Sequence, residues 1–225
     1  METDPSIRRV FATTMAFLAG VSFMLAGCET PPPKANVAFY LRSPEDLRNV
    51  QRVVFVELPA TSAGLEVSTC FSDAIVQAIA SQRLFHIEVI RRDDPVHDLL
   101  PTNRRRPFTI EELRQIRDAL RVDAVLVGDI TTYKPYPHMK MGVYLRLLDL
   151  KNGKLVWSVD DTWDAQQKDI EKRIEYYFHK NVGDQYDPVD WRLATVSPIM
   201  FQKFVAYEIS QTLRVDPPQP LETAK

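Results

Sequence analysis

The sequence predicts one α/β (α+β) domain, with a mixed β-sheet covered by helices in a two-layer or three-layer sandwich. Two observations carry this prediction. In the first half, apolar β-branched runs alternate with amphipathic stripes, an order typical of parallel strands joined by helical crossovers. In the second half, two consecutive strands flank a glycine turn and add an antiparallel hairpin. The predicted order is β-α-β-α-β-β-β-α-α, with no internal repeat.

The first crossover is predicted over residues 52–90. The run Arg52–Leu58 is apolar and β-branched, which favours a buried strand. A helix is expected over 66–81, because apolar residues recur there at four-residue steps on one face: Val67, Phe71, Ile75 and Ile79. The segment 84–90 alternates in polarity, which favours a second strand.

The second crossover is predicted to begin at a capping box. The hydroxyl of Thr109 and the carboxylate of Glu112 can satisfy free amides in the first turn of a helix. The helical stripe that follows consists of Ile110, Leu113, Ile116 and Leu120. The run 124–133 then begins as a continuous apolar segment, which is typical of a central strand.

A hairpin is predicted from strands over 139–150 and 155–163, which flank Asn152-Gly153. A two-residue turn is the simplest connection. However, the apolar side chains stand at odd positions in both strands, and cross-strand partners must point to the same side of the sheet. Pairing odd with odd positions favours a three-residue loop, 151–153, with a positive φ at Gly153.

Two helices are expected after the hairpin. In the segment 164–179, Ile170, Ile174 and Tyr177 share one face, whereas residues 180–196 show no regular pattern. Ser197-Pro198 combines an N-cap with a proline at the first helical position, and the last helix is expected to run to about residue 213. The predicted domain spans 50–214, and a flexible tail follows over 215–225.

The first 28 residues have the pattern of an export signal. Arg8-Arg9 precede a mainly apolar, uncharged run that is marginal in length for a membrane span. The next residues, Leu25-Ala26-Gly27-Cys28, resemble the bacterial lipobox. This resemblance implies cleavage between Gly27 and Cys28, a diacylglyceryl thioether on Cys28, and acylation of the new amino group by a fatty acid such as palmitate. An uncleaved N-terminal anchor helix is the alternative.

The residues after Cys28 predict sorting and a tether. Residue 29 is Glu rather than Asp, which resembles the default signal for the periplasmic side of the outer membrane. Arg8-Arg9 partly resemble a twin-arginine signal, so the export route stays open. Residues 28–49 contain three consecutive prolines and no apolar periodicity, so a lipidated cysteine followed by a proline-rich tether is expected there.

Charge and cysteine content exclude several classes of protein. The net charge of −2, from 28 basic and 30 acidic residues, argues against nucleic acid as a partner. Two cysteines are too few for a disulfide framework or a structural zinc site. If Cys28 carries lipid, Cys70 is the remaining thiol, and we expect it to be buried beside Phe71 and inert.

The stretch 122–158 carries a resemblance to a known family. Its segments VDAVLVGDITTY and MGVYLRLLDLKNGKLVWS are similar to the core of the curli-secretion-channel lipoprotein superfamily, which includes the penicillin-binding-protein activator lipoproteins. The resemblance covers about residues 50–213 and implies a mixed sheet and an envelope role. Channel-forming members insert two long amphipathic hairpins, whereas this chain has only the proline-containing segment 134–138 and a charged helix at those places. The resemblance therefore implies a non-pore-forming member.

No catalytic signature is present. The sequence lacks a phosphate-binding glycine loop, a Gly-x-Ser-x-Gly elbow and a His-Glu-x-x-His motif, and its four histidines lack metal-ligand spacing. His97-Asp98 could form an oriented base or a polar loop. Asp184, Asp187 and Asp190 are a weak candidate calcium site, with loop and cap chemistry as the alternative. No cofactor is predicted.

Two sets of residues are candidates for binding a partner. Arginines that bracket the loop before the second helix could dock an acidic protein or anionic lipid headgroups, or could simply be solvated: Arg91, Arg92, Arg104, Arg105 and Arg106. Aromatic residues could form an interface or belong to the core. The main candidates among them are Tyr133, Tyr136 and Tyr144, and further ones are Trp163, Tyr176 and Tyr177.

These patterns predict a lipid-anchored, non-enzymatic adapter or assembly factor that binds envelope proteins on the periplasmic side of the outer membrane. The alternatives are a subunit of an oligomeric secretion or envelope complex, which would form a homo-oligomer, and a divergent envelope hydrolase. The identity of the partner is not encoded in any recognisable motif.

Overall fold

The computed structural model describes residues 36–60, 63–99, 106–182 and 190–214. It confirms the predicted fold class, a mixed sheet covered by helices. The elements are β1 (Phe39–Leu41), α2 (Pro44–Arg48), β2 (Arg52–Val56), α3 (Leu65–Ser81), β3 (His86–Ile90), η1 (Pro95–Leu99), α4 (Ile110–Leu120), β4 (Ala124–Lys134), β5 (Lys140–Asp149), β6 (Leu155–Asp164), α5 (Lys168–Asn181), α6 (Leu193–Val196) and α7 (Pro198–Gln211).

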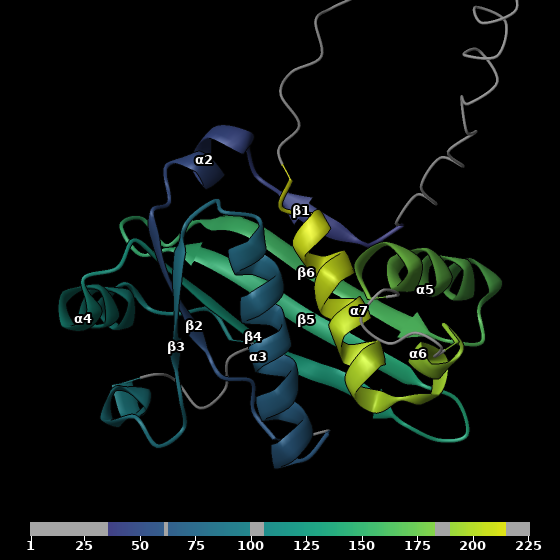
Figure 1. Ribbon diagram of the computed structural model, residues 1–225. Coiled ribbons are helices and arrows are strands. Elements are labelled where there is room, and N and C mark those ends of the chain that lie inside the picture. The colour runs from purple at the N-terminus through teal and green to yellow at the C-terminus, as the bar shows by residue number, and fades with distance from the viewer. Residues whose placement is uncertain (1–35, 61–62, 100–105, 183–189, 215–225) are drawn as a thin grey trace, which may run out of the picture. The chain divides into compact units, whose positions relative to one another are not determined.

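The six strands follow the order β1-β6-β5-β4-β2-β3 (Figure 1). β2 runs parallel to both β3 and β4, and the remaining neighbours are antiparallel. α3 joins β2 to β3 and α4 joins β3 to β4, as the two predicted crossovers require. Because β3 and β4 lie on opposite sides of β2, these helices cover opposite faces of the sheet.

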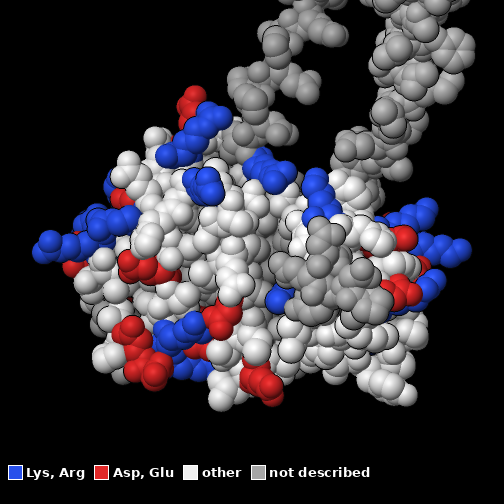
Figure 2. All heavy atoms as spheres, in the orientation of Figure 1, with Lys and Arg blue, Asp and Glu red and all other residues white. Residues whose placement is uncertain are grey.

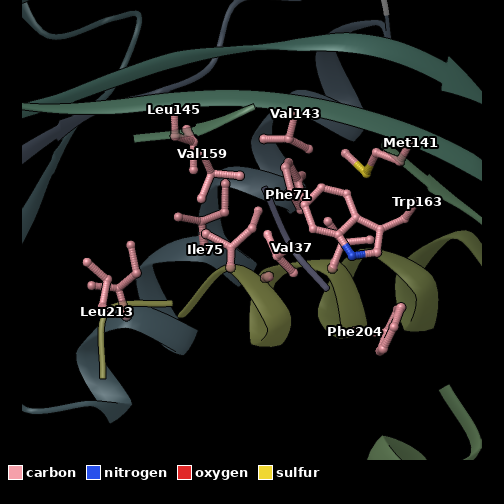
Figure 3. Close-up of a cluster of buried hydrophobic side chains, with 14 of the residues drawn as sticks. Val37, Phe71, Ile75, Met141, Val143, Leu145, Val159, Trp163, Phe204 and Leu213 are labelled. Carbon is pink, nitrogen blue, oxygen red and sulfur yellow. The ribbon is translucent and has the colours of Figure 1, made fainter. Parts of the chain in front are cut away.

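Two cores hold the layers together. The larger lies between the sheet and α3, α5 and α7, where Phe71 and Ile75 of α3 point toward Val143 and Val159 of the sheet (Figure 3). The smaller lies on the other face, where Leu113 and Ile116 of α4 pack on the valines of β2 and β4. The sandwich therefore has three layers over β2 and β4.

Folded structure begins earlier than the predicted boundary at residue 50. β1 pairs with the edge of β6, with Phe39 opposite Val159, and Ser43 caps α2 by accepting the amide hydrogen of Asp46. Val37 and Leu47 are buried in the larger core. The part of the predicted tether from Val37 onward therefore belongs to the domain.

The β5–β6 hairpin has the predicted register, but its loop differs in length from the predicted loop. Leu147 lies opposite Trp157 and Leu145 opposite Val159, and Gly153 has a φ of 69°. The loop, however, has four residues rather than three, because the amide of Asp149 donates to the carbonyl of Lys154. A bulge after Leu147 restores odd-with-odd pairing further along the strands.

Two predicted helix starts are confirmed by their caps, and a third helix begins later than predicted. Thr109 and Glu112 form both hydrogen bonds of the capping box. Ser197 accepts the amide hydrogen of Met200 at the start of α7. α5 begins at Lys168 rather than residue 164, because β6 continues to Asp164.

Cys70 is exposed on α3, so the prediction that it is buried was wrong. The buried side chains of α3 follow the stripe of Phe71, Ile75 and Ile79. Successive helix residues differ by about 100° around the axis, so Cys70 points away from that stripe. In the described ranges, none of the helices has the length and apolarity to cross a membrane.

Candidate protein-binding surface

The sheet face opposite α3 and α7 carries polar, accessible side chains beyond the part that α4 covers. Asp129, Tyr144 and Asp160 lie side by side on this face, as cross-strand partners in β4, β5 and β6. Asp129 and Tyr144 are partly exposed, and Asp160 is exposed. We call these three residues the Tyr144 row. The alternation of β5 had indicated Tyr144 as the predicted aromatic residue that points away from Leu145 and the core.

Small and hydroxyl-bearing side chains lie on both sides of the Tyr144 row. Towards one end of the strands, Thr132 and Thr162 flank Gly142, and a Cβ at Gly142 would lie 2.4 Å from the hydroxyl oxygen of Thr131. Towards the other end, Ser158 lies opposite Tyr40, which is 49% exposed. Hydroxyls, carboxylates and tyrosines make this face suited to a polar, hydrated protein interface.

Arg146 closes one border of the open face. Its guanidinium lies 5.4 Å from the ring centroid of Phe108 and donates a hydrogen bond to the carbonyl of Arg106. Burial lowers the pKa of Arg146, and a hydrogen bond with Tyr144 partly opposes this effect. Because Arg146 is 8% exposed and bound within the protein, it holds the segment 106–108 against β5.

The predicted arginine patch is largely engaged in internal contacts. Arg91 donates to the carboxylate of Asp73 at 2.6 Å, and Arg92 donates to the carbonyl of Leu58 at 2.6 Å. The amide of Arg92 also donates to Glu57 at 3.1 Å. Burial raises the pKa of Glu57, but its hydrogen bonds and these arginine charges outweigh burial and leave that pKa lowered. Arg91 and Arg92 thus fasten the end of β3 to β2 and α3.

Arg106 has a structural partner as well. Its guanidinium forms two hydrogen bonds with the carboxylate of Glu112, the same group that completes the capping box of α4. The hydrogen bonds from Arg106 and then from the Thr109 amide lower the pKa of Glu112 to about 2. Arg104 and Arg105 lie outside the described residues. The described arginines of this group therefore stabilise the domain rather than stand ready for a partner.

The predicted tyrosines do not form one surface. Tyr133 packs against the larger core on the helix-covered face, and burial raises the pKa of Tyr133. Tyr136 is 85% exposed in the turn after β4. Trp163 and Tyr177 belong to the core, whereas Tyr176 lies beside Lys180 on α5. Only Tyr144 of the three main candidates lies on the open sheet face among the described residues.

The candidate metal and base sites gain no support from the described residues. Asp190 accepts the amide hydrogen of Arg192 at 3.0 Å and pairs with its guanidinium, which is cap chemistry. Asp184 and Asp187, and the side chain of Asp98, lie outside the described residues. Within the described ranges, no cluster of His, Cys, Asp and Glu could hold a metal ion.

A buried ion pair between α5 and α7 was not predicted. The carboxylate of Glu208 accepts hydrogen bonds from Arg173 at 2.6 Å and from the Trp163 indole at 2.8 Å. Burial raises the pKa of Glu208, against the opposing effect of Arg173 and Trp163. The sequence does contain a signal for this buried pair, because both charged residues lie within the apolar stripes of their helices. Glu208 follows Phe204 by four residues, and Arg173 follows Ile170 by three.

No family model matches the sequence, and no curated protein does. Among solved structures, the PelC dodecamer from Paraburkholderia phytofirmans is 14% identical, with a TM-score of 0.41 over 60% of this chain and 86% of that chain. Lipoprotein GNA1162 from Neisseria meningitidis is 15% identical, with a TM-score of 0.38 over 62% and 99% of the two chains. LpoB from E. coli is 12% identical, with a TM-score of 0.35 over 60% and 74%.

These similarities are too weak to assign the chain to a family or to carry a function over to it. The resemblance to the curli-secretion-channel lipoprotein superfamily therefore stays a prediction from the sequence.

Proposed function

We propose that this protein is a lipid-anchored, non-enzymatic adapter that binds another envelope protein through the open sheet face around the Tyr144 row. The position of Tyr144 supports this proposal most strongly. It is a partly exposed aromatic side chain on a regular sheet, with Asp129 and Asp160 opposite it on the two neighbouring strands and the largely buried Arg146 two residues along β5. A side chain already held in place loses little conformational entropy when a partner binds.

The charges of this face indicate the chemistry of the partner. Asp160 is exposed beside Tyr144 as its cross-strand neighbour, whereas Arg146, two residues along β5, is only 8% exposed. Carboxylates and hydroxyls accept hydrogen bonds, and an acidic face attracts a basic one. We therefore expect a partner that presents lysine, arginine or free backbone amides around an apolar contact for the tyrosine ring.

The anchor gives the adapter its mechanism. The lipobox at Cys28 would place the domain at the membrane, and Glu29 favours the periplasmic side of the outer membrane. Two or three acyl chains are enough for stable membrane attachment. Tethering raises the local concentration of the domain near any partner in the same membrane, so that a modest contact suffices for binding.

A photo-crosslinking amino acid in place of Tyr144 tests this function in intact cells. We expect it to crosslink to one envelope protein. The same amino acid in place of Lys203, which is exposed on α7 and away from the open face, should not form that product. A product with a second copy of this chain would support the oligomeric alternative. Absence of any product at position 144, or identical products at both positions, would contradict the proposal.

A further inference from the structure

Three helices end at one edge of the domain. The amides of Gln51 and Arg52, before and in β2, donate to the carboxylate of Asp123, just before β4. The amide of His86 at the start of β3 donates to the carbonyl of Gln51 at 2.8 Å. Gln82, after α3, donates to Ser210 in the last turn of α7. The starts of β2, β3 and β4 therefore share an edge with the ends of α3, α4 and α7.

An exposed arginine follows each of these helices: Arg83 after α3, Arg121 after α4 and Arg214 after α7. Arg83 and Arg121 have φ values of 56° and 52°, a left-handed conformation in which glycine is free of strain and other residues are not. A cation at a helix C-terminus complements the helix dipole, which explains part of this pattern. It does not explain Arg52 and Lys154, basic residues of the same edge that lie at no helix end.

Further cations join them at this edge. Arg48 ends α2, Arg52 begins β2 and Lys154 lies beside the β5–β6 turn, whose Leu150 amide donates to the carbonyl of Asp123. We call the six residues the basic edge: Arg48, Arg52, Arg83, Arg121, Lys154 and Arg214. Figure 2 shows Lys and Arg along the upper border of the molecule, where Figure 1 places α2 and the last turns of α3 and α7.

The cations of the basic edge lack acidic partners among the described residues. None of the six forms an ion pair there, whereas Arg91, Arg106 and Arg173 each do. Nearby carboxylates are engaged, since Asp46 pairs with Arg42 and Asp123 accepts the amides of β2. Glu45 in α2 is the nearby exposed exception. The positive field of the basic edge is thus available to a ligand outside the domain.

The length of the tether allows the basic edge to reach the membrane. Asn36 lies eight residues after Cys28, a span of at most about 28 Å. β1 then leads to Arg42, whose amide donates to the carbonyl of Val156 close to the end of α7. Arg42 lies six residues after Asn36, about 20 Å in extended geometry, so the tether is long enough to bring the basic edge against the bilayer.

We propose that the basic edge docks on anionic phospholipid headgroups and so orients the domain on the membrane that holds its anchor. This inference rests on the proposed lipid anchor. Docking would hold the basic edge against the bilayer and leave the Tyr144 row, on a sheet face beside that edge, accessible to a partner in the periplasm.

Vesicle binding of the lipid-free chain from residue 29 onward, which contains every described residue, tests the docking separately from the anchor. We expect binding to vesicles with about one third phosphatidylglycerol, weaker binding at high salt, and none to pure phosphatidylcholine. The double variant R83G/R121G removes two charges at positions that favour glycine, and should bind about 25-fold more weakly, at about fivefold per arginine. The matched control K168Q/K172Q removes two exposed lysines from α5 and should bind as the parent does.

Equal binding by the parent and R83G/R121G, or an equal loss in K168Q/K172Q, would overturn the docking proposal. So would failure of the parent to bind the anionic vesicles, even if it then bound an acidic protein. None of these outcomes bears on acylation of Cys28 or on crosslinking at position 144, so docking and the proposed function can fail independently.

Discussion

At the scale of single residues, the ion pair between Glu208 and Arg173 is buried in the domain. Glu208 and Arg173 are 3% and 6% exposed, and the raised pKa of Glu208 shows that its contacts do not fully offset burial of its charge. Removal of one partner of such a pair leaves the other charge buried alone, whereas removal of both leaves none. The pair therefore links α5 to α7 without adding much net stability.

Glu208→Leu should lower the free energy of unfolding by about 3 kcal/mol, because it leaves the buried Arg173 guanidinium with exposed Asp169 as its one remaining carboxylate partner among the described residues. The double variant Arg173→Met/Glu208→Leu should recover most of that loss. Urea unfolding followed by Trp fluorescence measures both. A double variant less stable than Glu208→Leu would show instead that the ion pair itself stabilises the fold.

At the scale of elements, the sequence predicted the helices and strands that are marked by caps or periodic patterns within a short stretch of the chain. The capping box at Thr109, the N-cap at Ser197 and the apolar stripe of α3 each lie within a few consecutive turns. β1 and α2 were missed because three and five residues are too few to show a period. The loop length was wrong because a bulge elsewhere in β6 compensated for it, which local pairing rules do not reveal.

Gly153→Ala tests the left-handed turn of the β5–β6 hairpin. We expect a loss of about 1–2 kcal/mol in unfolding free energy, because the residue must keep a positive φ. A Cβ there would also lie 3.0 Å from a methyl group of Leu113. Gly153→Asn adds the same Cβ but tolerates a left-handed conformation, so it separates backbone strain from crowding. Gly153→Ala with unchanged stability would contradict the assigned turn.

For the candidate site, the sequence predicted Tyr144 as a candidate residue but did not predict that the arginines make internal contacts. Strand alternation alone places Tyr144 on the face opposite Leu145, so its location needs no tertiary information. Arg91 and Arg92 meet partners 18 and 35 residues away in sequence, at contacts that exist only after β2, α3 and β3 have packed. Among the described residues, the available positive charge therefore lies on the basic edge rather than on Arg91, Arg92 and Arg106.

In the whole molecule, the small net charge of −2 is the sum over surfaces of opposite charge, and two of these surfaces are separate from each other. The open sheet face presents Asp129 and Asp160 around Tyr144, and the basic edge presents cations without acidic partners among the described residues. If the membrane holds one surface, the other faces the periplasm. This division of roles depends on a lipid at Cys28, which would keep the domain at the bilayer where the basic edge can dock.

The mass of the protein purified from cell envelopes tests that anchor most directly. We predict a chain that begins at Cys28, lacks residues 1–27, and carries a diacylglyceryl thioether and an acylated amino group. The Cys28→Ser variant should keep residues 1–27 and carry no lipid. A wild-type protein that retains its first 27 residues, or whose Cys28 has a free thiol, would contradict the central claim.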